Sequence, residues 1–140
     1  MKVVPISKKK PPQWILDEVK KFGVSWESGV IFTYDGIISN CRGEMTEDLL
    51  AHEGNHIKQQ AKIGADNWWK KYFKDPTFRY EQELECYRKQ YQWIKNNIKD
   101  RNEIFKHLMH YARSLSSDMY GNLKTTQQAL SDIKLLDNFK

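Results

Sequence analysis

The chain has 140 residues, the length of one domain, and a net charge of +5 from 23 Lys and Arg against 18 Asp and Glu. Its aromatic content of 13% argues against disorder, and no run approaches the ~20 apolar residues of a membrane span. The basic residues are spread along the chain and match no nucleic-acid-binding motif. We therefore expect one globular domain over residues 1–140, with neither a membrane nor a specific nucleic acid as partner.

The N-terminal segment indicates where the protein works. It lacks the long apolar stretch and the small-residue cleavage site of a signal peptide, so we expect a cytoplasmic protein. In that compartment Cys41 and Cys86 should be reduced thiols that are not bonded to each other. Residues 1–10 contain three consecutive lysines and are expected to form a flexible basic leader.

The first half of the chain predicts one helix followed by a β-hairpin. Proline is tolerated in the first turn of a helix, so a helix should begin at Pro11-Pro12 and end before Gly23. Residues 30–34 and 37–41 are rich in β-formers and are separated by Asp35-Gly36. An Asp-Gly pair between two such runs is a strong hairpin signal.

The second half of the chain predicts mainly helices. Thr46 and the acidic residues after it suit the start of a helix. Residues 66–75 should form a short helix or an aromatic-rich loop, and a final helix, capped by Thr125 or Thr126, should end at Leu136. The other expected helices span residues 47–63, 76–97 and 100–114. The predicted fold class is therefore α+β and mostly helical.

Residues 52–56 read His-Glu-Gly-Asn-His, which is the most informative stretch of the sequence. On a helix, His52 and His56 lie one turn apart on the same face, so both imidazoles can bind one metal ion. Glu53 lies beside that face. There it can act as the general base on a water that the metal activates.

A helical wheel at 100° per residue tests this interpretation. It places His52 and His56 on the same side as Ile63, whereas Asn55 and Lys58 fall on the opposite side. We therefore expect both imidazoles to face inward. The alternative is a pair of buried histidines that only make hydrogen bonds.

Catalytic zinc usually has three protein ligands and one open position. The helix expected after residue 75 offers three carboxylates, Glu81, Glu83 and Glu85, and the wheel places only Glu83 on the apolar side. A carboxylate there is costly unless it is paired or bound to a metal. We predict Glu83 as the third ligand, with Glu85 as the next choice and Glu81 after it. An ion pair of Glu83 with Arg79 or Arg88 is the competing interpretation.

The sequence contains other candidate ligands. A metzincin needs a third histidine at position 62, where the chain has Lys62, so that class is excluded. His107 and His110 stay open as ligands, although a structural role on a later helix is favoured. Cys86 is interpreted as a small core residue.

Three further features have two interpretations each. Tyr120 is a candidate hydrogen-bond donor to a developing oxyanion, or a residue that packs its loop. Gln59 could line the site or pack structurally. The four aromatic residues between positions 68 and 73 could line a cleft, but core packing is favoured.

The motif at residues 52–56, followed by Glu83 with Cys86 three residues later, resembles the gluzincin branch of the zincin-like metallopeptidases. A longer pattern is similar to small single-domain metallopeptidases of bacteriophages and prophages. It comprises the Asp-Gly hairpin, residues 56–60, Trp68-Trp69, residues 83–91 and Tyr120-Gly121.

This resemblance implies a minimal zincin-like domain. In such a domain the short hairpin precedes the motif helix, and the long later helix carries the third ligand. It also implies one zinc ion per chain, and a sheet edge that holds an extended peptide by strand addition. The same resemblance implies a phage or host protein as partner and allows association with a virion.

The leading hypothesis is a zinc-dependent metallopeptidase with His52, His56 and Glu83 as ligands. Glu53 would take a proton from the attacking water and pass it to the leaving amine. The alternative is a catalytically weak or inactive zinc-binding protein with a structural or host-interaction role. The intact Glu53 argues against that alternative, because a purely structural site needs no base.

Overall fold

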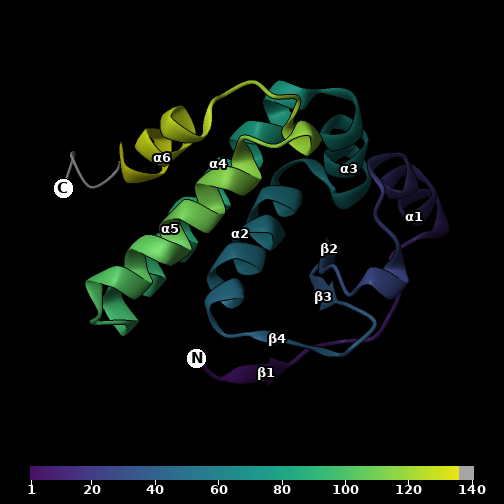
Figure 1. Cartoon of the computed structure of the whole chain (residues 1–140). Coiled ribbons are helices and arrows are strands. Elements are labelled where there is room, and N and C mark those ends of the chain that lie inside the picture. Colours follow the sequence, from purple (N-terminus) through teal and green to yellow (C-terminus); the bar gives the residue numbers. More distant parts are fainter. Residues whose placement is uncertain (136–140) are drawn as a thin grey trace. The chain divides into compact units, whose positions relative to one another are not determined.

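The computed structural model describes residues 1–135 and divides the chain into two compact units, Met1–Phe73 and Lys74–Lys140 (Figure 1). The described residues are mostly helical, with two small antiparallel sheets of two strands each. This confirms the predicted α+β, mostly helical class. The final helix was predicted to end at Leu136, which lies outside the described residues.

The first unit has a helical segment directly after the two prolines, where the sequence predicted it. Helix α1 spans Gln13–Val19 and continues as the 3-10 turn η1, Lys20–Phe22. Gly23 then ends the helical segment with a left-handed backbone, φ 76°. Glycine adopts this conformation without the steric cost that a Cβ atom brings.

The Asp-Gly hairpin forms as predicted. Strands β2, Phe32–Tyr34, and β3, Ile37–Ser39, pair antiparallel. Asp35 and Gly36 both have positive φ, 49° and 84°, as the tight two-residue turn requires. A second 3-10 turn, η2, Trp26–Ser28, precedes the hairpin.

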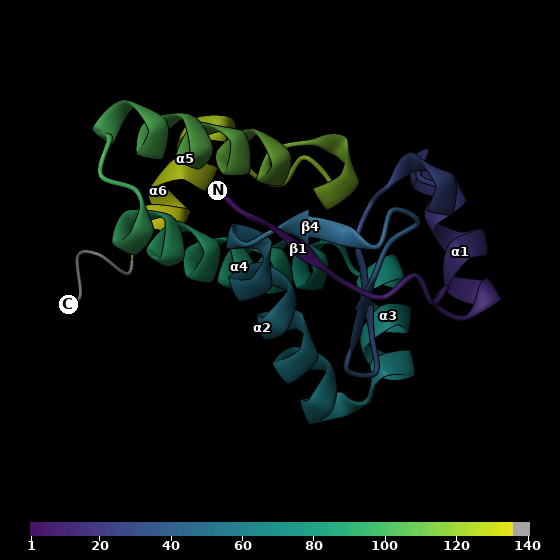
Figure 2. The same ribbon diagram turned by 90° about the horizontal axis from the view of Figure 1, so that it is seen from below.

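A second sheet pairs the N-terminus with a distant segment. Strand β1, Val3–Pro5, runs antiparallel to β4, Glu44–Thr46, with Val4 opposite Met45 (Figure 2). Residues 1–10 were expected to be a flexible leader, so this strand differs from the expectation. A three-residue strand with only one half-buried side chain has no alternating pattern from which it could be predicted.

Helix α2 spans Asp48–Ile63 and buries an entirely polar set of side chains. The buried residues are Asp48, His52, Glu53, Asn55, His56, Gln59 and Gln60. The wheel was right to turn both histidines inward. It was wrong for Ile63, which is 44% exposed, and for Asn55, which is buried. The wheel failed there because it assumed that apolar residues mark the inward face.

Helix α3, Ala65–Lys74, supplies an aromatic core to the first unit. Trp68, Trp69 and Tyr72 are all buried, which confirms core packing for them. Trp68 stacks on Tyr72 with 4.9 Å between ring centroids, and Trp69 lies 6.3 Å from Phe32 of β2. Aromatic pairs at such distances add to the stability that burial alone supplies.

Gln60 ties the hairpin to α2. Its Nε2 donates to the Thr33 carbonyl oxygen at 2.7 Å, and its Oε1 accepts from the Asp35 backbone N–H at 3.1 Å. The Trp69 indole N–H donates to the same Thr33 carbonyl at 3.0 Å. The position of β2 against α2 therefore depends on the buried side-chain amide of Gln60, and the indole of Trp69 supports it.

The second unit is helical in its described part. Helices α4, Pro76–Asn97, and α6, Thr126–Lys134, pack against α5, Arg101–Leu115. The 3-10 turn η3, Asp118–Tyr120, lies in the loop before α6 and contacts α4. Side chains cap the three helices: Asp75 for α4, Asp100 for α5 and, for α6, Thr125, which is one of the two predicted caps.

Polar contacts hold α4 to α6 within this unit. The Tyr80 hydroxyl donates to Asp132 Oδ2 at 2.7 Å, and Arg88 Nε donates to the Asp132 carbonyl at 2.9 Å. Burial and the hydrogen bond to Asp132 raise the pKa of Tyr80, so the phenol stays neutral. Within residues 1–135, no helix combines the length and the apolar character that crossing a membrane requires.

Gln60→Ala should destabilise the first unit. The substitution removes two hydrogen bonds and leaves the Asp35 backbone N–H without that acceptor, which costs about 1–3 kcal/mol of unfolding free energy. Urea denaturation followed by tryptophan fluorescence measures the change. Gln127→Ala, at an exposed position on α6, is the control and should stay within about 0.5 kcal/mol. Equal stability of the two variants would contradict the role given to Gln60.

Candidate metal centre

Helix α2 presents two imidazoles side by side. The ring centroids of His52 and His56 lie 5.0 Å apart at an interplanar angle of 71°, and each residue is only 5% exposed. The four-residue spacing produces this pairing, because it returns the chain to the same helix face one turn later. Two adjacent imidazoles inside a protein are suited to binding one metal ion.

The second histidine is oriented by its neighbours. His56 Nδ1 lies 2.8 Å from Gln59 Oε1, and the imidazole packs against Trp68 with ring centroids 5.1 Å apart. An amide oxygen can only accept a hydrogen bond, so Nδ1 carries the proton and the Nε2 lone pair points outward from this bond. Gln59 thus fixes the tautomer that a metal ligand needs.

Glu53 is buried on α2 and is hydrogen-bonded to the hairpin. Thr33 Oγ1 on β2 donates to Glu53 Oε2 at 2.8 Å. Thr33 is itself held by the donors from Gln60 and Trp69 to its carbonyl oxygen. The carboxylate of the predicted general base therefore has one oxygen fixed by a rigid part of the first unit.

Helix α4 buries one of its three candidate carboxylates. Glu83 is 7% exposed, whereas Glu81 and Glu85 are exposed. The helical wheel placed only Glu83 on the inward side, and the structure confirms that Glu83 is the buried one of the three. The Tyr120 hydroxyl donates to Glu83 Oε2 at 3.2 Å, which orients the carboxylate.

The loop that carries Tyr120 is fixed by two features. Arg79 Nε donates to the Met119 carbonyl oxygen at 2.7 Å. Gly121 follows with φ 78°, and a Cβ atom there would lie 2.8 Å from Pro76 Cβ. No other residue fits this approach without moving the backbone. The Tyr-Gly pair that the sequence singled out therefore has a structural reason.

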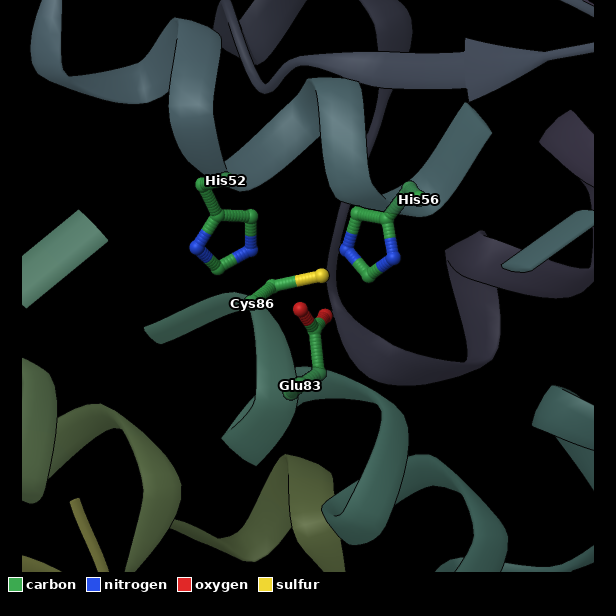
Figure 3. Close-up of side chains that lie close together, drawn as sticks. All are labelled: His52, His56, Glu83 and Cys86. Carbon is green, nitrogen blue, oxygen red and sulfur yellow. The ribbon is translucent and has the colours of Figure 1, made fainter. Parts of the chain in front are cut away.

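Cys86 lies together with the three predicted ligands. Sequence reasoning missed this residue. His52, His56, Glu83 and Cys86 each offer one ligand atom, and these atoms all lie within 4.8 Å of one another. Figure 3 shows the four side chains directed toward one another from α2 and α4. All four are buried, and together they could bind a metal ion. The signal that could have found Cys86 was its spacing of three residues from Glu83, which places both on one helix face.

His107 and His110 were left open as ligands by the sequence. Both lie on α5, and neither belongs to this group of four. Their rings lie near Tyr111 instead, with centroid distances of 6.3 Å and 6.2 Å. This arrangement agrees with the structural role that was favoured for them.

The hairpin edges differ from the expected peptide-binding edge. In this antiparallel pair the backbone groups of Thr33 and Ile38 point away from the partner strand. The Thr33 carbonyl accepts the Gln60 and Trp69 side chains, and the Ile38 carbonyl accepts the Ser7 backbone N–H at 3.2 Å. Both outward carbonyls therefore already have partners within the chain.

Comparisons with known proteins add no relative. A scan against protein-family models, a search of curated proteins and a search of solved structures each found no significant match to this chain.

Glu83→Ala should weaken zinc binding steeply, because it removes an oxygen ligand from the buried group. Glu85→Ala is the matched control, since Glu85 is exposed on the same helix. Isothermal titration of the metal-free protein with zinc measures both affinities. Loss of binding in Glu85→Ala with normal binding in Glu83→Ala would show that the wrong carboxylate has been assigned.

Gln59→Leu should lower zinc affinity about 10- to 100-fold while leaving one site per chain. The leucine removes the acceptor that holds His56 Nδ1, so the imidazole loses its fixed tautomer. The same titration measures the affinity, and circular dichroism checks that the fold is retained. An unchanged affinity would mean that the bond to Gln59 does not support metal binding.

Proposed function

We propose that this protein is a zinc-dependent hydrolase of the metallopeptidase type. The observation that carries the proposal is the convergence of the His52, His56 and Glu83 ligand atoms, with the buried carboxylate of Glu53 next to the first ligand in the sequence. Two imidazoles and a carboxylate are the ligand set of a common class of catalytic zinc site.

The donor types favour zinc over other divalent ions. Imidazole and thiol groups suit zinc, whereas magnesium and calcium prefer sites built from oxygen. When bound, zinc supplies a Lewis acid that lowers the pKa of a water and polarises a carbonyl group. We propose one such ion per chain.

Glu53 is the proposed general base. It lies one residue after His52, and its Oε2 accepts a hydrogen bond from Thr33. That bond holds the carboxylate in one orientation, so the other oxygen can take a proton from the attacking water. The same carboxyl group then delivers the proton to the leaving amine.

Tyr120 is proposed as a positioning residue. The sequence made it a candidate donor to the oxyanion, but its hydroxyl donates to the carboxylate of Glu83. A hydrogen bond to a ligating carboxylate fixes its orientation and supports metal affinity. This contact favours a role that acts through Glu83.

The proposed substrate class is a polypeptide, and it rests on the resemblance to small phage metallopeptidases. The chain's own contacts at Thr33 and Ile38 favour a peptide that binds without adding a strand there. A phage or host protein is the proposed source of that peptide, in the bacterial cytoplasm.

A second candidate function is a zinc-binding protein without catalysis, with a structural or host-interaction role. Cys86 favours it, because four protein ligands form a closed zinc site. Glu53 favours the hydrolase, since a closed structural site has no use for a buried carboxylate beside it.

Glu53→Gln tests the hydrolase. It keeps the shape and removes the base, so peptide hydrolysis should fall by a factor of about 100 or more while zinc content stays at one per chain. Cleavage of a mixed peptide library, read by mass spectrometry, measures activity. Glu103→Gln, at an exposed position on α5, is the control. Equal cleavage by Glu53→Gln and the parent protein would eliminate the general-base mechanism.

A further inference from the structure

Cys86 has properties that a simple core residue does not need. It is fully buried, at 0% exposure, and its sulfur belongs to the same group of ligand atoms as the two histidines and Glu83. The three-residue spacing on α4 directs the thiol and the carboxylate to the same place (Figure 3). Cys41, the only other cysteine, contacts the Glu27 carbonyl oxygen through its sulfur and lies outside this group.

The distances suit one ion. Zinc binds nitrogen at about 2.0–2.1 Å and sulfur at about 2.3 Å, so two ligand atoms of one tetrahedral zinc lie about 3.4–3.6 Å apart. The four atoms all lie within 4.8 Å of one another, so they must move closer together when an ion binds. The thiol is therefore within the reach of an ion that the other three residues hold.

We propose that Cys86 is a fourth protein ligand, so that the resting site is a closed zinc site of two imidazoles, one carboxylate and one thiolate. The inference rests on the proposed zinc site. On binding, the thiol proton passes to water and the thiolate takes the position that a catalytic zinc leaves open for water. The sulfur must then leave the ion before a substrate can be cleaved, so the parent protein should cleave peptides measurably but more slowly than Cys86→Ala.

Cobalt spectroscopy tests the ligand directly. A thiolate bound to Co2+ gives a charge-transfer absorption in the near ultraviolet, which nitrogen and oxygen ligands do not give. The metal-free parent protein titrated with Co2+ should show this band at one equivalent. Cys41→Ala is the matched control and should keep the band. Cys86→Ala should lose it completely while still binding Co2+ through the other three residues.

A chemical measurement covers the case in which Cys86→Ala does not fold. In the Cys41→Ala background Cys86 is the single thiol, and its alkylation by N-ethylmaleimide in mild urea can be timed with and without zinc. Zinc should slow the alkylation. An equal rate with zinc bound would overturn the proposal.

The outcomes separate this inference from the proposed function. Stoichiometric Co2+ binding without the band, or a band that survives in Cys86→Ala, overturns the role of Cys86 and leaves the three-ligand site intact. A parent protein that binds neither zinc nor Co2+ overturns both. In the last case, the parent protein shows the band and Cys86→Ala does not, but folded, zinc-loaded Cys86→Ala cleaves no peptide. That result supports Cys86 as a ligand and overturns the hydrolase.

Discussion

Helix α2 buries seven side chains, and all of them are polar or charged. Burying a polar group costs free energy unless the group has a hydrogen-bond partner. Each polar group on such a face therefore needs a partner of its own. Within residues 1–135, no buried side-chain nitrogen or oxygen lacks a hydrogen-bond partner. Gln60 holds the hairpin, Thr33 holds Glu53, and Gln59 holds His56. A helix that only filled a core would bury apolar residues at lower cost. The polar face of α2 is therefore best explained by the chemistry of its histidines and glutamate.

Helix α4 and the turn η3 position Glu83 and Cys86, the other two side chains of the candidate metal centre, in a similar way. Glu83 and Cys86 share one helix face, so the helix geometry alone sets their relative position. Tyr120 fixes the carboxylate, and Gly121 permits the close approach to Pro76 that fixes Tyr120. A mutation in this turn should thus change the site without touching a ligand.

The local elements of the fold could be predicted because their signals are local. Asp75 and Pro76 mark the start of α4, and Asp35-Gly36 marks the hairpin turn. The pairing of β1 with β4 could not be predicted, since it joins residues 39 to 43 positions apart through strands of three residues. The histidine pair could be predicted from its four-residue spacing. Glu83 could be predicted from the helical wheel, because α4 does bury apolar residues such as Ile94 on that side. Cys86 was missed because a buried cysteine is usually a small core residue, and only the three-dimensional group of ligand atoms distinguishes the two roles.

The central claim is that one zinc ion is held by two imidazoles, a carboxylate and a thiolate of this chain. X-ray absorption spectroscopy of the zinc-loaded protein tests it most directly, because it identifies the atoms bound to the ion. We expect one sulfur at about 2.3 Å and three nitrogen or oxygen atoms at about 2.0–2.1 Å, with the outer-shell pattern of two imidazoles. A shell of oxygen atoms without imidazole, or a protein that retains no zinc, would contradict it.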